Sequence, residues 1–79
     1  MGRIFKVWMN SGAVLHYLIK ENISQNELAE RLSISSGYMS QLVNGRRCPS
    51  PRLRKKMLDV LSHLTFSGLF NVENKNESI

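Results

Sequence analysis

The stretch Ser24–Gly45, SQNELAERLSISSGYMSQLVNG, decides the fold of this chain. Ser24 is a favourable residue for the N-cap of a helix, and Glu27 follows three residues later, which is the spacing of a capping box. Apolar or small residues then recur at helical spacing: Leu28, Ala29 and Leu32. The stretch therefore predicts a short helix that begins after Ser24 and buries one side.

A second short helix is expected after a tight turn at Ser33–Ser35. Ser35 can cap this helix, and Asn44-Gly45 is a normal signal for its end. Its inner face carries Met39, Leu42 and Val43. On a helical wheel the outer face carries Gly37, Ser40, Gln41 and Asn44, with Ser36 and Tyr38 on the flanks. The sequence thus predicts two helices in contact, the second with a polar outer face.

This pair of helices resembles the helix-turn-helix of the Cro and lambda-repressor family, also called the Xre type. The resemblance rests on SQNELAERL, on the small Ala29 that lets the two helices touch, and on the closing LVNG. It extends from about Val14 to Phe70 and implies an all-α, compact DNA-binding domain of four to five helices. An ordinary helical hairpin without a DNA role is the alternative. The short helices, the length of the turn and the basic surroundings together disfavour it.

The chain departs from the family pattern at two places. The turn often has glycine where this chain has Ser33, because the backbone there favours positive φ; serine adopts that geometry at a cost of about 1 kcal/mol. Many members also pair an Arg in the first helix with a Glu near the end of the third. The resemblance aligns those positions with Leu18 and Val43. Because both are apolar here, no charge is left unpaired, and we expect the two side chains to pack directly.

Composition limits the partners of the protein. The chain has 79 residues, enough for one small domain, and 42% of them are hydrophobic. Its net charge is +5 and its pI about 9.9, which favours an anionic partner, nucleic acid before membrane. Residues 46–56 hold six basic residues and no acid: Arg46, Arg47, Arg52, Arg54, Lys55 and Lys56. Such a run can be a solvated helix face, but after the second helix of the motif it is better interpreted as a rim that contacts phosphates.

Several function classes have no support in the sequence. Cys48 is the single cysteine, so no internal disulfide or cysteine-built metal site is expected. His16 and His63 lie far apart in the chain without partners at ligand spacing. No nucleophile–base pair or phosphate-binding loop is present, so we expect neither an enzyme nor a cofactor. No signal peptide or membrane span is recognised, which favours the cytoplasm.

The segment before the first helix, residues 1–10, is β-prone and aromatic. It carries Ile4, Phe5, Val7 and Trp8, and it is expected to form a short strand or extended arm. An isolated strand needs a partner, so we expect the arm to pair with its copy in a second molecule or to pack on the helical body, and so to help make a dimer. The alternative is a frayed leader with Trp8 folded onto the core.

The remaining helices follow from spacing and caps. The first is expected from Ser11 or Gly12 to about Glu21, with an apolar side made of Val14, Leu15, Leu18 and Ile19, and with Tyr17 at its border. Ser50 as a cap and Pro51 at the first position begin another, which is expected to run to about His63. Its inner side is Leu53, Met57, Val60, Leu61 and Leu64. A last single turn follows within 65–70, and the polar residues 71–79 are expected to be disordered. The domain is thus assigned to residues 11–70.

The resemblance also implies which residues meet DNA. Four positions would face bases in the major groove: Ser36, Gly37, Tyr38 and Gln41. Gln41 is the best candidate, because its amide can bond to adenine in a bidentate way. Seven positions would contact phosphates: Gln25, Asn26, Ser40, Asn44, Arg46, Arg47 and Arg52. Gln25 and Asn44 can also be plain helix-end polar residues, and Arg52 can point away from DNA.

The function that the resemblance implies is a sequence-specific DNA-binding transcriptional regulator. The favoured form is a repressor that acts as a dimer on a two-fold operator. The alternative is an antitoxin-type module that neutralises a toxin and regulates its own operon, with the apolar arm or the tail as the binding element. A nonspecific nucleoid binder is a third hypothesis, because Gly37 provides no side chain at the centre of the face that would contact bases.

Overall fold

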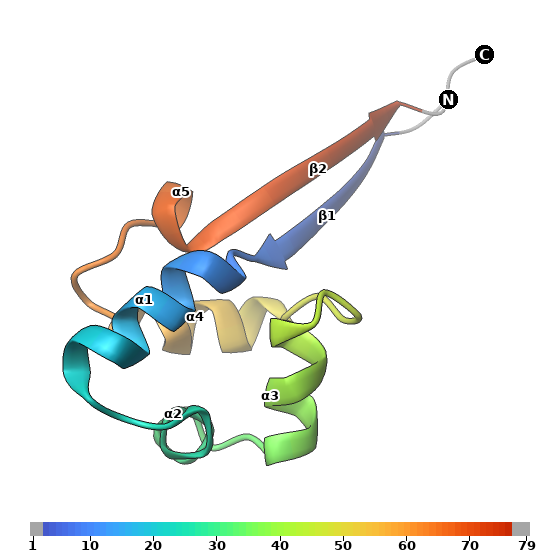
Figure 1. The fold of residues 1–79 in the computed structure, drawn as a ribbon. Coiled ribbons are helices and arrows are strands. Elements are labelled where there is room, and N and C mark those ends of the chain that lie inside the picture. The colour runs from blue at the N-terminus through green and yellow to red at the C-terminus, as the bar shows by residue number, and fades with distance from the viewer. Residues whose placement is uncertain (1–2, 77–79) are drawn as a thin grey trace.

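The computed structural model of the chain describes the backbone of residues 3–76 and the side-chain surroundings of residues 5–73. In the order of the described part of the chain, one strand is followed by five helices and then by a second strand, which lies beside the first (Figure 1). The elements are β1 Arg3–Met9, α1 Ser11–Glu21, α2 Gln25–Arg31, α3 Ser36–Val43, α4 Pro51–Val60, α5 Phe66–Leu69 and β2 Phe70–Asn76. The fold is therefore the expected compact helical domain, with a small two-stranded sheet added to it.

Each helix begins at a polar side chain that accepts a hydrogen bond from a backbone N–H in the first turn. These caps are Asn10, Ser24, Ser35, Ser50 and Thr65. Such a bond satisfies one of the amide groups that a helix start leaves without a partner. The sequence predicted three of these caps, at Ser24, Ser35 and Ser50, and these are confirmed. Only one half of the predicted capping box forms, because the Glu27 carboxylate pairs with Arg31 at 3.1 Å.

The helix ends also follow the local chemistry. The Asn22 cap ends α1 in the left-handed region at φ 57°, and Gly45 after α3 has φ 70°. Ser33 in the turn between α2 and α3 has φ 59°, which confirms that the turn requires a positive φ that serine tolerates less well than glycine. The turn of the motif is thus formed as expected despite the missing glycine.

The core is apolar and lies between the helices and the base of the sheet. Its members are Met9, Val14, Tyr17, Leu18, Leu28, Ala29, Leu32, Met39, Leu42, Leu53, Met57, Leu61, Leu69 and Phe70. The prediction that Leu15 and Ile19 lie on the buried side of α1 is wrong, because Leu15 is 44% exposed and Ile19 76% exposed. Tyr17, expected at the border, is buried instead, and its hydroxyl donates to the Val60 carbonyl at 3.5 Å. The buried side of α1 is therefore centred on Val14, Tyr17 and Leu18.

The helix α4 is shorter than predicted. It ends at Val60 rather than near His63, and Leu61, its C-cap, is completely buried with a backbone φ of −96° and ψ of 59°. The chain turns there because Leu61 points into the core and the following residues must lead back to α5. Val60 and Leu64, expected to face inward, are only half-buried. The predicted single turn is confirmed as α5, and Leu69 and Phe70 close the core.

The two ends of the chain form an antiparallel ribbon. Its register runs from Arg3 opposite Asn76 to Met9 opposite Phe70, and the ribbon projects away from the helices (Figure 1). The predicted disorder of residues 71–79 is therefore wrong for residues 71–76, while residues 77–79 lie outside the described part. Polar composition suggested disorder, but a strand is held by backbone hydrogen bonds, and β1 supplies them. The buried pair Met9 and Phe70 anchors the ribbon to the core.

The strand expected near the N-terminus is confirmed, but its partner is not the one expected. β1 pairs with β2 of the same chain. Its end also packs on the helical body, which was one of the two expectations, because Met9 is buried in the core and Val7 packs against it. Trp8 is not folded onto the core either: its indole N–H donates to Glu73 across the ribbon at 3.1 Å, and the Lys6 ammonium lies 5.8 Å from its ring. β1 thus finds a strand partner within one molecule.

Candidate nucleic-acid interface

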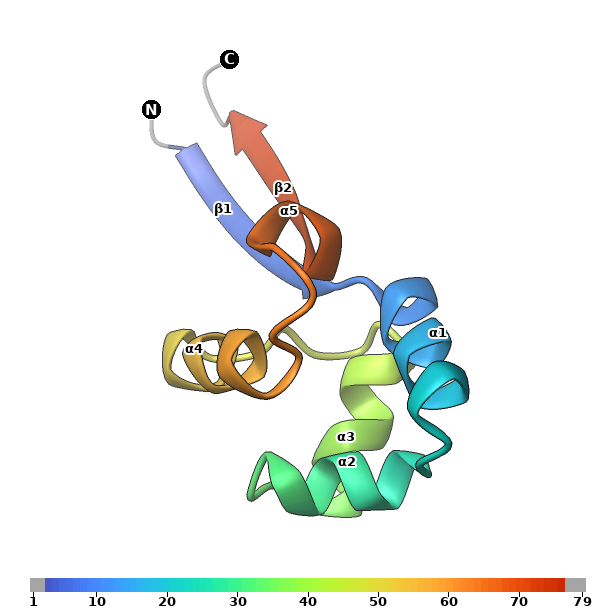
Figure 2. The ribbon, with the colours of Figure 1, turned by 90° about the vertical axis from the view of Figure 1, so that its left-hand side faces the viewer.

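The two helices of the motif are held by short-range backbone bonds and by the core. The N–H of Ile34 donates to the Ala29 carbonyl at 3.0 Å, so the chain turns directly after α2, and Ala29 is 2% exposed. Figure 2 shows α2 lying across the N-terminal end of α3. At the other end of α3, the Ser11 hydroxyl donates to the Val43 carbonyl at 2.6 Å. α3 is therefore fixed at both ends, which sets the direction of its outer face.

The outer face of α3 is open to solvent. Ser36, Gly37 and Gln41 are exposed and Tyr38 is half-buried, whereas Met39 and Leu42 on the inner face are buried. The four positions that the resemblance assigned to base reading thus lie together on one side of α3. Their contacts with bases stay a prediction.

Arg47 reaches back from the loop after α3 onto this face. Its guanidinium carbon lies 4.4 Å from the centre of the Tyr38 ring, and its Nη1 donates to Gln41 Oε1 at 3.4 Å. The sequence placed Arg47 on the phosphate rim, and no spacing rule linked it to the two reading residues. The contact depends on the path of the loop at Gly45, which only the structure supplies.

The other residues expected to contact phosphates are exposed or half-buried. Asn26 is exposed and Gln25 half-buried at the start of α2, and Arg46 and Arg52 are exposed. The Asn44 amide donates to the Ser40 hydroxyl at 3.3 Å, so these two side chains hold each other at the end of α3. Their phosphate roles stay a prediction.

Two other members of the basic run, Arg54 and Lys56, make hydrogen bonds within the domain. The guanidinium of Arg54 donates to the Pro49 carbonyl at 3.2 Å, which holds the loop before α4. The Lys56 ammonium donates to the Ser33 hydroxyl at 3.1 Å. Sequence reasoning did not find this contact between α4 and the turn of the motif, because it joins elements that are not neighbours in the chain.

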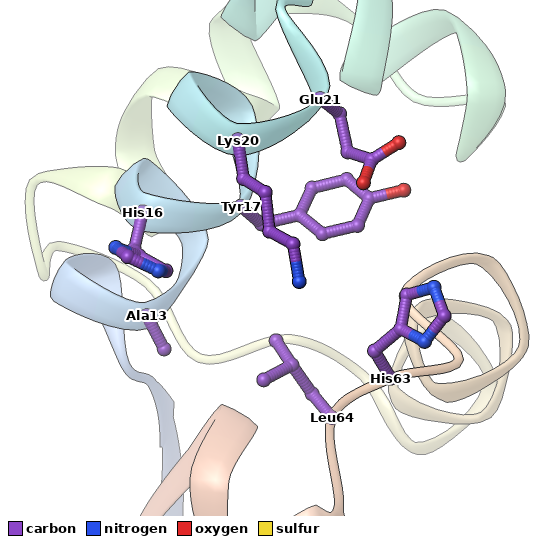
Figure 3. Close-up of a pocket in the computed structure, with 7 residues that line it drawn as sticks. All are labelled: Ala13, His16, Tyr17, Lys20, Glu21, His63 and Leu64. Carbon is purple, nitrogen blue, oxygen red and sulfur yellow. The ribbon is translucent and has the colours of Figure 1, made fainter.

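A separate hollow of about 250 Å³ lies between α1 and the chain after α4. It is lined by Ala13, His16, Tyr17, Lys20, Glu21, His63 and Leu64 (Figure 3). His16 and His63, far apart in the sequence, thus line one hollow. Even so, the described residues contain no group of three or more His, Cys, Asp or Glu that could hold a metal ion. None of the helices between residues 3 and 76 has the length and apolar character that a membrane span requires.

Two short helices joined by a tight turn, the second with an exposed polar face beside an arginine loop, define a helix-turn-helix DNA-binding domain. A family model described as helix-turn-helix matches residues 16–69, and the chain belongs to this Xre/Cro-type family. It is also similar to a protein of Bacillus subtilis (strain 168) named as the uncharacterized HTH-type transcriptional regulator YvzC. The two are 32% identical over 65 residues, which cover 82% of this chain and 83% of the relative. No solved structure matches the chain.

This membership confirms the resemblance that the sequence suggested. The chain is a helix-turn-helix transcriptional regulator, in a family of DNA-binding proteins that are not enzymes. The predicted class, fold and absence of catalysis are therefore correct.

Proposed function

We propose that this regulator is a sequence-specific repressor that reads the major groove with α3 and acts as a dimer. One observation carries the proposal: the polar face of α3 is exposed, while both ends of the helix are fixed to the body. A rigid helix with exposed polar side chains suits the width of the major groove. Repression then needs no chemistry, since occupation of a promoter excludes the polymerase.

Affinity and register would come from different residues. Arg46 and Arg52, both exposed, would neutralise phosphates and release counterions, which gives affinity for any duplex. Side chains on α3 would then discriminate among base pairs. Because Gly37 presents no side chain, part of the specificity would come from DNA shape and from the spacing of two half-sites.

Support for the dimer comes from the terminal ribbon. A two-stranded ribbon alone is marginal in water, and the outer edges of a sheet can pair with further strands. Phe5 is 59% exposed and Val72 52% exposed, and the register places Val72 opposite Val7 on the same face as Phe5. This apolar face continues outward from the core pair Met9 and Phe70. We propose that a second copy covers it, which would give the symmetric dimer that a two-fold operator requires.

Selection of bound duplexes from a random pool tests DNA reading. A repressor of this kind should enrich one half-site motif, repeated as an inverted pair at a constant separation. Equal affinity for selected and random DNA at physiological salt would instead indicate a nonspecific nucleoid binder.

Sedimentation equilibrium tests the dimer. Val72→Lys should convert the dimer to a monomer, because it places a charge on the covered face. Asn71→Lys adds the same charge to the other face of β2 and should leave the dimer intact. If the unmodified protein is a monomer and co-purifies with a toxin, the antitoxin alternative replaces this part of the proposal.

A further inference from the structure

Arg47 differs from its neighbour Arg46 in what its side chain contacts. Arg47 lies 4.4 Å from the Tyr38 ring centre and donates to Gln41 at 3.4 Å, although all three side chains are solvent-accessible. Arg46 is exposed, and within the described residues its side chain makes no hydrogen bond, ion pair or ring contact. The positive charge of Arg47 is therefore held over the first two turns of α3, whereas that of Arg46 is free to find a phosphate.

The hydrogen bond changes what Gln41 can offer to a base. A guanidinium has donors and no acceptor, so its bond to an amide must end on the amide oxygen, as it does at Oε1 of Gln41. Bidentate pairing with adenine needs that oxygen to accept from the adenine amino group. A positive charge beside the oxygen opposes the approach of another donor. The Nε2 donors of Gln41 remain available to the groove.

From this geometry we propose that Arg47 is a specificity-determining residue that reads a base edge jointly with Gln41. The pair presents N–H donors from both side chains, and the base edge that offers two acceptors in the major groove is that of guanine, through N7 and O6. The inference deepens the proposed function and rests on it, since it requires α3 to enter the groove. Arg47 then contacts a base rather than a phosphate, and the base that Gln41 contacts is guanine rather than adenine.

The Tyr38 ring explains why an arginine is needed. The planar guanidinium stacks on an aromatic ring and keeps its fork of donors in one orientation, so little freedom remains to be lost when the base binds. A lysine at the same position would retain the charge without the fork. The substitution Arg47→Lys therefore tests the contribution of the fork, and Arg47→Ala tests that of the whole side chain.

The test is selection from a random duplex pool with the full chain and four variants: Arg47→Lys, Arg47→Ala, Arg46→Lys and Arg46→Ala. The unmodified protein should select guanine at one position of each half-site. Arg47→Ala should lose that preference by roughly tenfold and Arg47→Lys by less, with the other positions unchanged. The Arg46 variants should retain the motif, and Arg46→Ala should weaken binding to all sequences alike. Thermal unfolding checks that each variant remains folded, as expected for exposed side chains.

Other results overturn the inference. If Arg47→Ala keeps the guanine preference, or if it weakens all sequences evenly as Arg46→Ala does, Arg47 is a phosphate contact. Selection of adenine rather than guanine at the position that the Arg47 variants change contradicts it as well. In each of these cases a motif is still selected, so the proposed function stands. If the unmodified protein selects no motif at all, the proposed function and this inference both fail.

Discussion

The substitution Leu18→Arg tests how α1 is held against the end of α3. Leu18 is 7% exposed, and no buried polar or charged side chain occurs in the described core. The change removes about 2–3 kcal/mol of apolar burial and places a guanidinium without an acidic partner in its place. Together these effects should lower the free energy of unfolding by about 3–5 kcal/mol. For a domain of this size, the melting temperature should fall by at least roughly 12 °C.

A second substitution shows whether Val43 is the neighbour of Leu18. Val43 is half-buried against the core, so Val43→Glu alone should cost only about 1–2 kcal/mol. In the double variant the new carboxylate can pair with the new guanidinium. The double variant should therefore be more stable than Leu18→Arg alone, with a coupling of about 1–3 kcal/mol.

Urea denaturation, followed by circular dichroism, measures the free energy of unfolding of all of these variants, and heating measures their melting temperatures. The control combines Leu18→Arg with Asn44→Glu. Because position 44 is exposed, the carboxylate of the introduced glutamate should not restore the stability lost in Leu18→Arg. An unchanged melting temperature for Leu18→Arg would refute the burial argument. Strict additivity in the double variant would refute the direct packing of Leu18 on Val43.

Three further outcomes are expected. Asn10→Ala should lower stability by about 2 kcal/mol in urea denaturation, because its side chain both caps α1 and donates to the Gly68 carbonyl at 3.2 Å; a loss no larger than that of Ser24→Ala would contradict the second role. Ser24→Ala, which removes only the cap of α2, should lower stability by about 1 kcal/mol in the same assay. Arg46→Ala should reduce the slope of log affinity against log salt by about 0.9 per protomer, measured by fluorescence anisotropy on duplex DNA, and an unchanged slope would exclude a phosphate contact.

Local chemistry made much of the fold predictable. The caps Ser24, Ser35 and Ser50 and the buried stripe of α2 and α3 depend on residues within one or two turns of each other, so their spacing in the sequence is informative. The positive φ of Ser33 was expected from the resemblance, because glycine often occupies this position of the turn. The candidate reading face could be predicted for the same reason, since one helical period decides which side chains of α3 point outward.

What the sequence by itself determined is therefore the set of helices and the polar face of α3. The tertiary structure decided the partner of each remaining segment. Residues 71–76 look disordered by composition, yet they form β2 because β1 lies beside them, and the Trp8–Glu73 bond joins residues 65 positions apart. Likewise, the sequence shows Arg47 only as one member of a basic run, whereas the structure places it against Tyr38 and Gln41. Pairing of this kind depends on the path of the backbone through space, and no periodicity within a short window encodes that path.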